Sequence, residues 1–328
     1  MDITETRPAT SDEWDHYYQN CPVATFFQGR EWAEIWEAAT DGAIHPAPRL
    51  VTFADDAKIL LPFSAVEGPA TTEYRAAPEG TYGAPLYEKN ASLQDEHSRV
   101  LFEYLNSDNV RLRQNPFDPW LNAKNVSVEW EKEGFTQALR LEQGFDAIHD
   151  TLRKNDVYRK YGQARDADLS LELVSNNSPA VIDRFYEIYQ ACRERWGEDA
   201  SHNYDKVVFE SFDFESPDID FWVVKQNSMI ICGGPFLRAN NFHVVSWLTL
   251  ADPSCFDVRP YEFIYYRLIS HYCDEEFSIF DFNPSGGHEG VIKFKDNFGT
   301  DRIQSNVFDS RSTVHKGLSF LEETFQSE

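Results

Sequence analysis

The sequence predicts an α+β protein of two units, each a mixed, largely antiparallel sheet flanked by helices. Its 328 residues correspond to two domains at about 150 residues each. The second half runs in the order helix, three strands, helix, strand, loop, strand, which is typical of an α+β layer and not of a doubly wound sheet. No Gly-x-Gly-x-x-Gly follows a predicted strand and no Walker A sequence occurs, which argues against dinucleotide-binding and P-loop folds.

The first unit is predicted to span residues 1–141. Apolar residues at helical spacing predict helices at residues 11–21, 29–40 and 93–105. Apolar runs predict strands at residues 50–53, 58–63, 110–113 and 136–141. The first two strands flank Asp55-Asp56 and form a predicted hairpin, and residues 66–85, rich in Gly, Pro and Thr, are a predicted loop.

The second unit is predicted to span residues 142–314. Helices are predicted at residues 145–165, 179–196 and 260–272, the last with Pro260 in its first turn. Strands are predicted at residues 169–173, 220–224, 229–232, 242–250, 278–282 and 303–308, with a Gly-rich loop between the last two. A final helix is predicted at residues 315–325.

The charge balance limits the choice of partners. The 55 acidic and 30 basic residues give a formal net charge of −25, which repels phosphate backbones and argues against DNA binding. An anionic ligand therefore needs a local basic cluster. The chain has only 11 lysines against 19 arginines, and this composition favours a protein adapted to high salt. An ordinary acidic cytosolic protein is the alternative.

Targeting, membrane and metal signals are lacking in the sequence. No apolar run approaches 18 residues, and the start, Met1 to Glu5, has neither a basic nor an apolar signal region. A cytoplasmic protein without membrane insertion is therefore expected. The five cysteines form no Cys-x-x-Cys pair and the nine histidines no His-x-x-x-His pair, so no metal site is expected.

Two segments of the second half resemble the Fem-type branch of the GNAT acyltransferases. Residues 280–287, Phe-Asp-Phe-Asn-Pro-Ser-Gly-Gly, resemble the Asp-Phe-Gly-x-Ser of that branch. Residues 290–299, Gly-Val-Ile-Lys-Phe-Lys-Asp-Asn-Phe-Gly, are similar to its Gly-x-x-x-Phe-Lys-x-x-Phe-Gly. Weaker similarities at residues 26–32, 153–160, 246–247 and 259–262 extend the resemblance over about residues 12–310.

The resemblance implies two tandem GNAT-like domains with the site mainly on the second, and residues 315–328 as a helix that packs on the first domain. It implies transfer of an acyl or aminoacyl group to the amine of a small molecule or peptide. The implied donors are acyl-CoA or aminoacyl-tRNA, with no tightly bound cofactor. Where the superfamily has a glycine-rich loop for the CoA pyrophosphate, residues 256–261 have no glycine, and Pro260 has no N–H to donate.

Three residues are the predicted catalytic groups. Amine acylation requires one group that accepts the proton of the amine, one that stabilises the oxyanion and one that protonates or neutralises the leaving group. Lys295, which the resemblance places at the reaction centre, can stabilise the oxyanion. Asp281 can accept the amine proton, and Tyr261 can protonate the leaving group. The alternatives are a surface lysine in a charged turn, a turn-capping aspartate and a core aromatic residue.

The predicted binding residues begin with a basic cluster between residues 153 and 165. At helical spacing Lys154, Tyr158, Tyr161 and Arg165 share one face, which fits a phosphate-binding surface or a solvated exterior. The full predicted binding set is Lys154, Arg159, Lys160, Arg165, Arg195, Trp247 and Ser285. A second hypothesis remains open: a non-catalytic module on a degenerate GNAT scaffold that binds a peptide, a nucleotide or a nucleotide sugar.

Overall fold

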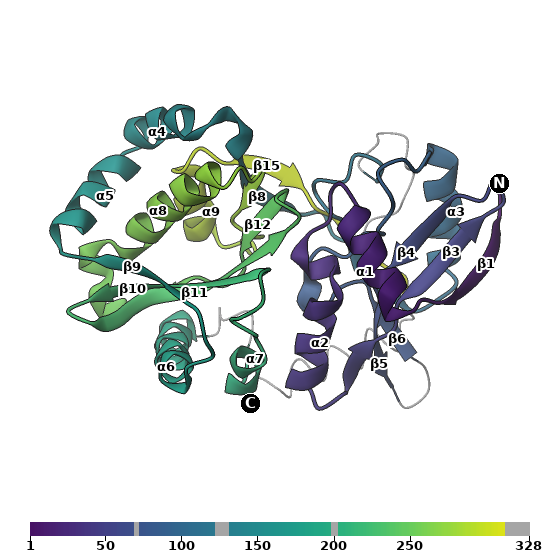
Figure 1. Ribbon diagram of the computed structural model, residues 1–328, viewed down its shortest axis with the longest axis horizontal. Helices are drawn as coiled ribbons and strands as arrows, with labels where there is room; N and C mark the ends of the chain where they lie inside the picture. Colours follow the sequence, from purple (N-terminus) through teal and green to yellow (C-terminus); the bar gives the residue numbers. More distant parts are fainter. Residues whose placement is uncertain (69–71, 122–130, 198–202, 312–328) are drawn as a thin grey trace. The chain divides into compact units, whose positions relative to one another are not determined.

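The computed structural model describes residues 1–68, 72–121, 131–197 and 203–311 and divides into two compact units (Figure 1). The first unit is Met1–Phe135 together with the segment from Ile303, and the second is Thr136–Arg302. The predicted boundary fell after residue 141, so the strand at residues 136–141 lies in the second unit. The predicted helix at residues 315–325 lies outside the described residues.

The first unit contains two small sheets. One is antiparallel, in the order β1-β3-β4, and the other has the order β16-β7-β6-β5-β2. The strands are β1 (Ile3–Pro8), β2 (Ile44–Pro46), β3 (Arg49–Phe53), β4 (Lys58–Leu61), β5 (Ser64–Glu67), β6 (Thr72–Arg75), β7 (Val110–Arg113) and β16 (Val307–Asp309). The helices are α1 (Ser11–Asn20), α2 (Arg30–Ala39) and α3 (Asp95–Leu105).

The second unit is built on one large mixed sheet. Its strand order is β15-β8-β14-β12-β11-β10-β9, with β13 paired to β11. The strands are β8 (Phe135–Arg140), β9 (Ser170–Val174), β10 (Ile219–Gln226), β11 (Met229–Ala239), β12 (His243–Ser246), β13 (Leu250–Ala251), β14 (Ile279–Asp281) and β15 (Asp301–Gln304). All neighbouring pairs from β9 to β12 are antiparallel, and β12 pairs with β14 in parallel.

Helices cover both faces of this large sheet (Figure 1). They are α4 (Phe145–Lys154), α5 (Val157–Asp166), α6 (Pro179–Trp196), α7 (Lys206–Glu210), α8 (Pro260–Asp274) and α9 (Glu289–Asp296). α5, α8 and α9 lie on one face, and α6 and α7 lie on the other. The predicted α+β class with mixed, largely antiparallel sheets is confirmed.

Several sequence predictions about elements were wrong, among them the strand predicted at residues 242–250, which is interrupted between β12 and β13. The predicted loop at residues 66–85 contains the second half of β5 and all of β6. The helix predicted at residues 145–165 is interrupted at Asp156, whose φ of 68° is left-handed. The predicted Gly-rich loop holds α9, because Gly286 and Gly287 complete a turn before the helix begins at Glu289. The last predicted strand is two strands, β15 and β16, in different sheets.

The parallel pairing between β12 and β14 is short, and this positions the candidate site. It covers three residue pairs, from His243 opposite Ile279 to Val245 opposite Asp281. Beyond that point the segment after β12 runs beside β11, where β13 pairs with Cys232 and Gly233. Gly234 permits this approach, since a Cβ there would lie 2.0 Å from the carbonyl oxygen of Leu248. β12 and β14 therefore separate just after Asp281.

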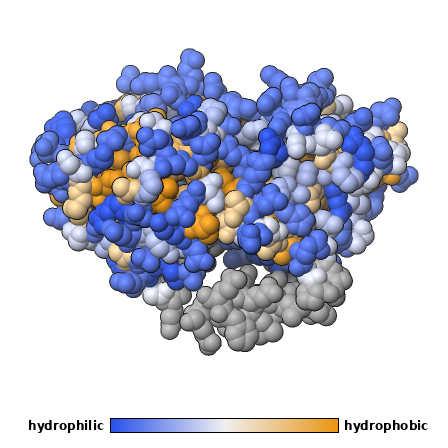
Figure 2. All heavy atoms as spheres, turned by 60° about the horizontal axis from the view of Figure 1, so that its bottom comes forward, coloured by the Kyte–Doolittle hydropathy of each residue, from blue (hydrophilic) through white to orange (hydrophobic). Residues whose placement is uncertain are grey.

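The face of the molecule shown in Figure 2 is largely hydrophilic, as the net charge predicts. The second unit also has apolar residues on this face. Its exposed large apolar side chains are Tyr158, Leu173, Val207, Met229 and Val291. Among the described helices, none is both long and apolar enough to cross a bilayer.

Candidate active site

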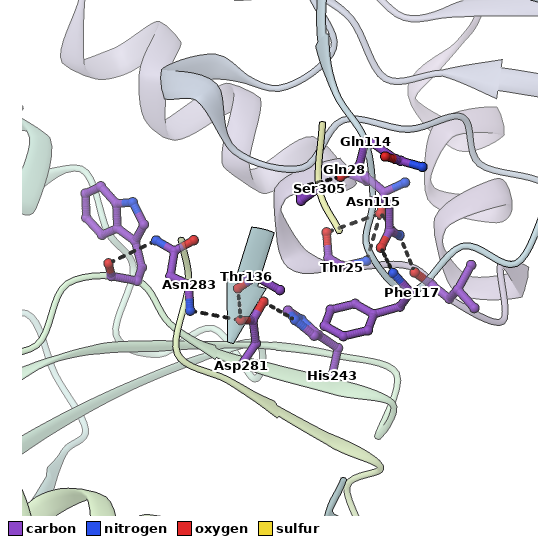
Figure 3. A network of polar contacts seen from close by, with 12 residues as sticks. Thr25, Gln28, Gln114, Asn115, Phe117, Thr136, His243, Asp281, Asn283 and Ser305 are labelled. Carbon is purple, nitrogen blue, oxygen red and sulfur yellow. Dashed lines mark hydrogen bonds and ion pairs between the residues drawn. The ribbon is translucent and has the colours of Figure 1, made fainter. Parts of the chain in front are cut away.

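Asp281, the last residue of β14, is fully buried at the point where the strands separate. Its Oδ1 accepts hydrogen bonds from Thr136 Oγ1 at 2.6 Å and from the N–H of Asn283 at 2.8 Å. Its Oδ2 lies 3.2 Å from Nε2 of His243 (Figure 3). Because both oxygens have partners and the side chain has no exposed area, this geometry favours a carboxylate that joins β8, β12 and β14. It does not favour the predicted proton acceptor.

Lys295 points into the second unit and not into solvent. The residue is 6% exposed, and its ammonium donates a hydrogen bond of 2.6 Å to the backbone carbonyl of Asn283. Burial lowers the pKa of Lys295 to about 8, against the attraction of the Asp281 carboxylate. No carboxylate in the described part of the chain forms an ion pair with it. The alternative of a surface lysine in a charged turn is therefore wrong.

Tyr261 lies in the first turn of α8 and packs between Phe256 and Phe294, with ring centroids 6.0 and 5.9 Å away. Its hydroxyl oxygen accepts a hydrogen bond of 3.0 Å from the N–H of Ala251. Burial raises the pKa of this phenol well above its ordinary value. These contacts favour the core-aromatic alternative, and the role of proton donor to the leaving group stays a prediction.

The predicted basic face does not form as one helical face. Lys154 ends α4, whereas Tyr158, Tyr161 and Arg165 belong to α5, which begins after the break at Asp156. The Tyr161 ring is not free to act as a shelf, since it stacks on Tyr266 with centroids 3.9 Å apart.

Three of the four predicted cations of this stretch have carboxylate partners. Arg159 binds both oxygens of Asp156, at 2.6 and 2.8 Å. Lys160 lies 3.4 Å from Glu262, and Arg165 lies 3.7 Å from Asp166. Lys154 is exposed at the end of its helix. Phosphate binding by these residues stays a prediction.

The other predicted binding residues lie in different surroundings. Trp247 is 7% exposed and packs against Tyr204 and Phe212, with ring centroids 5.5 and 5.4 Å away. The Arg195 guanidinium lies 4.9 Å from the centre of the Phe256 ring. The Ser285 hydroxyl donates a hydrogen bond of 3.1 Å to Oε1 of Gln137.

Two residues that the sequence analysis did not select hold the site together. The backbone of Asn283 accepts a hydrogen bond from Lys295 and donates one to Asp281. Its Nδ2 donates to the carbonyl oxygen of Trp247 at 3.3 Å, and Figure 3 shows the contact with Asp281. Gln137, fully buried on β8, donates from Nε2 to the carbonyl of Ile292 and to Asp296 on α9, at 3.1 and 2.8 Å. Two signals were available in the sequence: the asparagine in place of a glycine, and the two adjacent polar residues Thr136 and Gln137 in a strand that also holds Phe135, Ala138 and Leu139.

The structure thus brings Lys295, Asp281 and Trp247 together around Asn283, and Ser285 follows in the same loop. Lys295 and Asp281 are thus two charged side chains that are buried next to Asn283. Among the described residues, no group of three or more His, Cys, Asp or Glu side chains could hold a metal ion.

Comparison with known proteins agrees with this architecture. Residues 152–296 match the family model of the acetyltransferase (GNAT) domain. The crystal structure of FemX superposes with a TM-score of 0.67 at 14% identity, covering 98% of this chain and 100% of that one. The C-terminal domain of a putative lysylphosphatidylglycerol synthetase from Agrobacterium fabrum gives a TM-score of 0.58 at 10% identity, with 96% and 97% covered. The structure of L-PGS from Bacillus licheniformis gives 0.54 at 8% identity, with 96% of each chain covered.

No curated protein matches the sequence. The whole chain has the fold of these structures, and residues 152–296 of the second unit match an acetyltransferase (GNAT) domain. The resemblance seen in the sequence is therefore confirmed for the fold of the whole chain and for a GNAT domain match within the second unit.

Proposed function

We propose that the chain is an N-acyltransferase or aminoacyltransferase that transfers an acyl group from an activated donor to the amine of a small molecule or peptide. The amine nitrogen forms a bond to the donor's carbonyl carbon. The bond from that carbon to the thiol sulfur of CoA or to the ribose oxygen of tRNA then breaks. The amine gives up one proton, and the leaving group gains one.

The observation that carries the proposal is the buried ammonium of Lys295. A tetrahedral intermediate places negative charge on the former carbonyl oxygen, and a fixed cation with little water around it stabilises that charge strongly. Within the described residues Nζ makes one hydrogen bond, to Asn283. An ammonium has three N–H donors, so Lys295 can still donate to a substrate oxygen.

The beginning of α8 bears on the choice of donor. Pro260 is the first residue of this helix and lacks an N–H, and Glu262 in the first turn is a buried carboxylate. A pyrophosphate at this helix end would meet that negative charge, although Lys160 lies beside it. The missing N–H of Pro260 and the carboxylate of Glu262 therefore support a donor whose diphosphate does not bind at the beginning of α8. Aminoacyl-tRNA and an acyl-CoA bound in another way both satisfy that condition.

The test is a turnover assay with both donor classes. The purified chain is incubated with acyl-CoAs of increasing length or with charged tRNA, together with a panel of primary amines and short peptides. Products are identified by mass spectrometry. Amide formation by the wild type that Lys295→Met removes would support the proposal. The absence of product from every donor and acceptor would contradict it.

The non-catalytic binding module remains a second candidate, because two observations favour it. Asp281 has no exposed area, and the Asn283 amide lies across the point where β12 and β14 separate. A thermal-shift screen with peptides, nucleotides and nucleotide sugars distinguishes the candidates. Stabilisation by one of these ligands, with no product in the turnover assay, would favour the binding module.

A further inference from the structure

We infer that Asn283 is a positioning residue for the proposed reaction, whose side-chain amide fixes the backbone carbonyl that holds the ammonium of Lys295. The inference rests on the proposed function of Lys295. It adds a residue that would act on the reaction through that lysine and not by touching the substrate.

Three polar groups of Asn283 contact different parts of the site, and Figure 3 shows the two hydrogen bonds that its two nitrogen atoms donate. Its N–H donates to Oδ1 of Asp281 at 2.8 Å, and its carbonyl accepts from Nζ of Lys295 at 2.6 Å. Its side-chain Nδ2 donates to the carbonyl of Trp247 at 3.3 Å. One residue therefore links the end of β14, the helix α9 and the segment that follows β12.

The backbone conformation explains why asparagine suits this position. Asn283 has a φ of 63°, in the left-handed region that few residues other than glycine and asparagine adopt at low cost. Glycine would also allow the turn and both backbone contacts. The side-chain hydrogen bond to Trp247 is what asparagine adds.

The side-chain hydrogen bond of Asn283 lies just beyond the point where the backbone pairing between β12 and β14 ends. Ladder pairing between β12 and β14 ends at Val245 and Asp281, so the backbone after Asp281 is no longer held by its neighbour strand. The amide of Asn283 reaches the Trp247 carbonyl two residues beyond that end. It thus continues the connection between the two segments through a side chain.

Loss of this connection should loosen the carbonyl that contacts Lys295. A buried ammonium that loses a fixed acceptor draws in water or shifts toward solvent, and either change stabilises its charged form. The present pKa of about 8 reflects burial. The pKa of Lys295 therefore reports whether Asn283 keeps the ammonium in place.

The test compares Asn283→Gly with a matched control, Asn227→Gly. Asn227 also has a left-handed φ, of 50°, but it lies in the exposed turn between β10 and β11. Lysine labelled with ¹³C at Cε is incorporated, the Lys295 signal is assigned by its loss in Lys295→Met, and its chemical shift is followed against pH. We expect the midpoint to rise by about one unit or more in Asn283→Gly and to stay unchanged in Asn227→Gly.

Kinetics provide the second measurement once a donor and acceptor are known. In Asn283→Gly we expect kcat to fall about tenfold while KM for the acceptor changes less than about twofold, because the loss affects charge stabilisation and not acceptor binding. A purely structural role would lower the melting temperature and leave the Lys295 midpoint where it is.

An unchanged midpoint in folded Asn283→Gly would overturn the inference. Failure of this variant to fold would also overturn it, since glycine adopts the same backbone conformation and the inference gives the amide only a local role. If the wild type forms no product with any donor, the proposed function fails. The titration of Lys295 still decides the positioning role in that case, because it requires no turnover.

Discussion

Lys295 shows what a sequence motif can and cannot reveal about one residue. The Phe-Lys-x-x-Phe-Gly pattern indicated its importance, but nothing in the sequence showed that its ammonium would be buried against a backbone carbonyl. That contact depends on the left-handed turn at Asn283, twelve residues earlier in the chain. Such a contact arises from how α9 packs on the sheet, and residue spacing alone does not encode it.

Replacement of Lys295 should remove activity and preserve the fold. Burial of an ammonium is costly, so Lys295→Met, which keeps most of the aliphatic side chain, should leave the melting temperature within about 3 °C of the wild type or raise it. The proposed loss of oxyanion stabilisation should lower kcat by about a hundredfold or more. A marked loss of stability together with retained turnover would contradict the assigned role.

The same residue predicts how activity depends on pH. Burial lowers the pKa of Lys295 to about 8, and the proposed reaction uses the charged form. Activity should therefore fall as pH rises through about 8. The measurement is kcat against pH with a donor that is stable up to pH 9.5. A rate that keeps rising to that pH would show that the reaction does not need the ammonium.

Asp118 of the first unit provides a stability prediction independent of the site. This carboxyl is buried, Oδ1 accepts from the Tyr87 hydroxyl and the N–H of Trp120, both at 2.8 Å, and Oδ2 accepts no hydrogen bond from the described residues. Burial raises the pKa of Asp118 to about 6, against the effect of the Tyr87 hydrogen bond. The folded state therefore binds a proton that the unfolded state has already released between about pH 4 and pH 6.

The free energy of unfolding contributed by Asp118 should thus fall as pH rises from about 4 to 6 and stay constant above that range. Asp118→Asn lacks this loss, so its stability relative to the wild type should increase by roughly 1–3 kcal/mol between pH 4 and pH 7. Urea unfolding of both proteins at the two pH values measures the difference. The control is Asp41→Asn in an exposed turn, and an equal change in both variants would refute the prediction.

At the scale of elements, Asp281 is expected to act mainly through stability. Its carboxylate joins three strands through Thr136, Asn283 and His243. Asp281→Ala would leave these buried groups without their acceptor and should destabilise the protein by about 3 kcal/mol or more. Exposed Asp257→Ala is the control. A folded, stable Asp281→Ala that has lost only turnover would instead restore the predicted catalytic role.

Periodicity predicted the elements that bury a regular apolar face and failed for those that do not. The helix predicted at residues 179–196 agrees with α6, Pro179–Trp196, and the strand predicted at residues 220–224 lies within β10, Ile219–Gln226. β1 was missed because four of its six residues are polar or charged. β6, Thr72–Arg75, was missed for a similar reason, since Tyr74 is its one aromatic or aliphatic side chain. Backbone pairing with neighbouring strands, and not an apolar pattern, defines both.

At the scale of the whole chain, the return of the last segment to the first unit could not be predicted. The N–H of Gln114 donates to the carbonyl of Asn306 at 2.8 Å, and the hydroxyl of Ser305 donates to the carbonyl of Gln114 at 2.8 Å. Gln28 and Asn115 form a buried amide pair in the same unit, 3.2 Å apart (Figure 3). Contacts between residues so distant in sequence leave no local signal, so the predicted domain ended at residue 314 and not at Arg302.

The net charge of −25 leads to a prediction about salt. With 55 acidic and 30 basic residues, repulsion between carboxylates outweighs attraction within ion pairs, and it opposes the compact state. The distance over which charges interact falls from about 10 Å at 0.1 M salt to about 3 Å at 1 M. The melting temperature should therefore rise steeply as NaCl increases toward about 1 M and then much more slowly, since screening is by then nearly complete.

The shape of this curve separates screening from a general effect of solutes. Sucrose at equal osmolality strengthens burial by exclusion from the protein surface and should give a gradual rise without a break. A salt-adapted protein should show the steep rise and should be folded only above the lowest NaCl concentrations of that range. An ordinary acidic protein should be folded at every NaCl concentration. A melting temperature that stays constant or falls up to 1 M NaCl would show that favourable ion pairs, such as Arg49 with Asp108 at 2.7 Å, outweigh the excess of carboxylates.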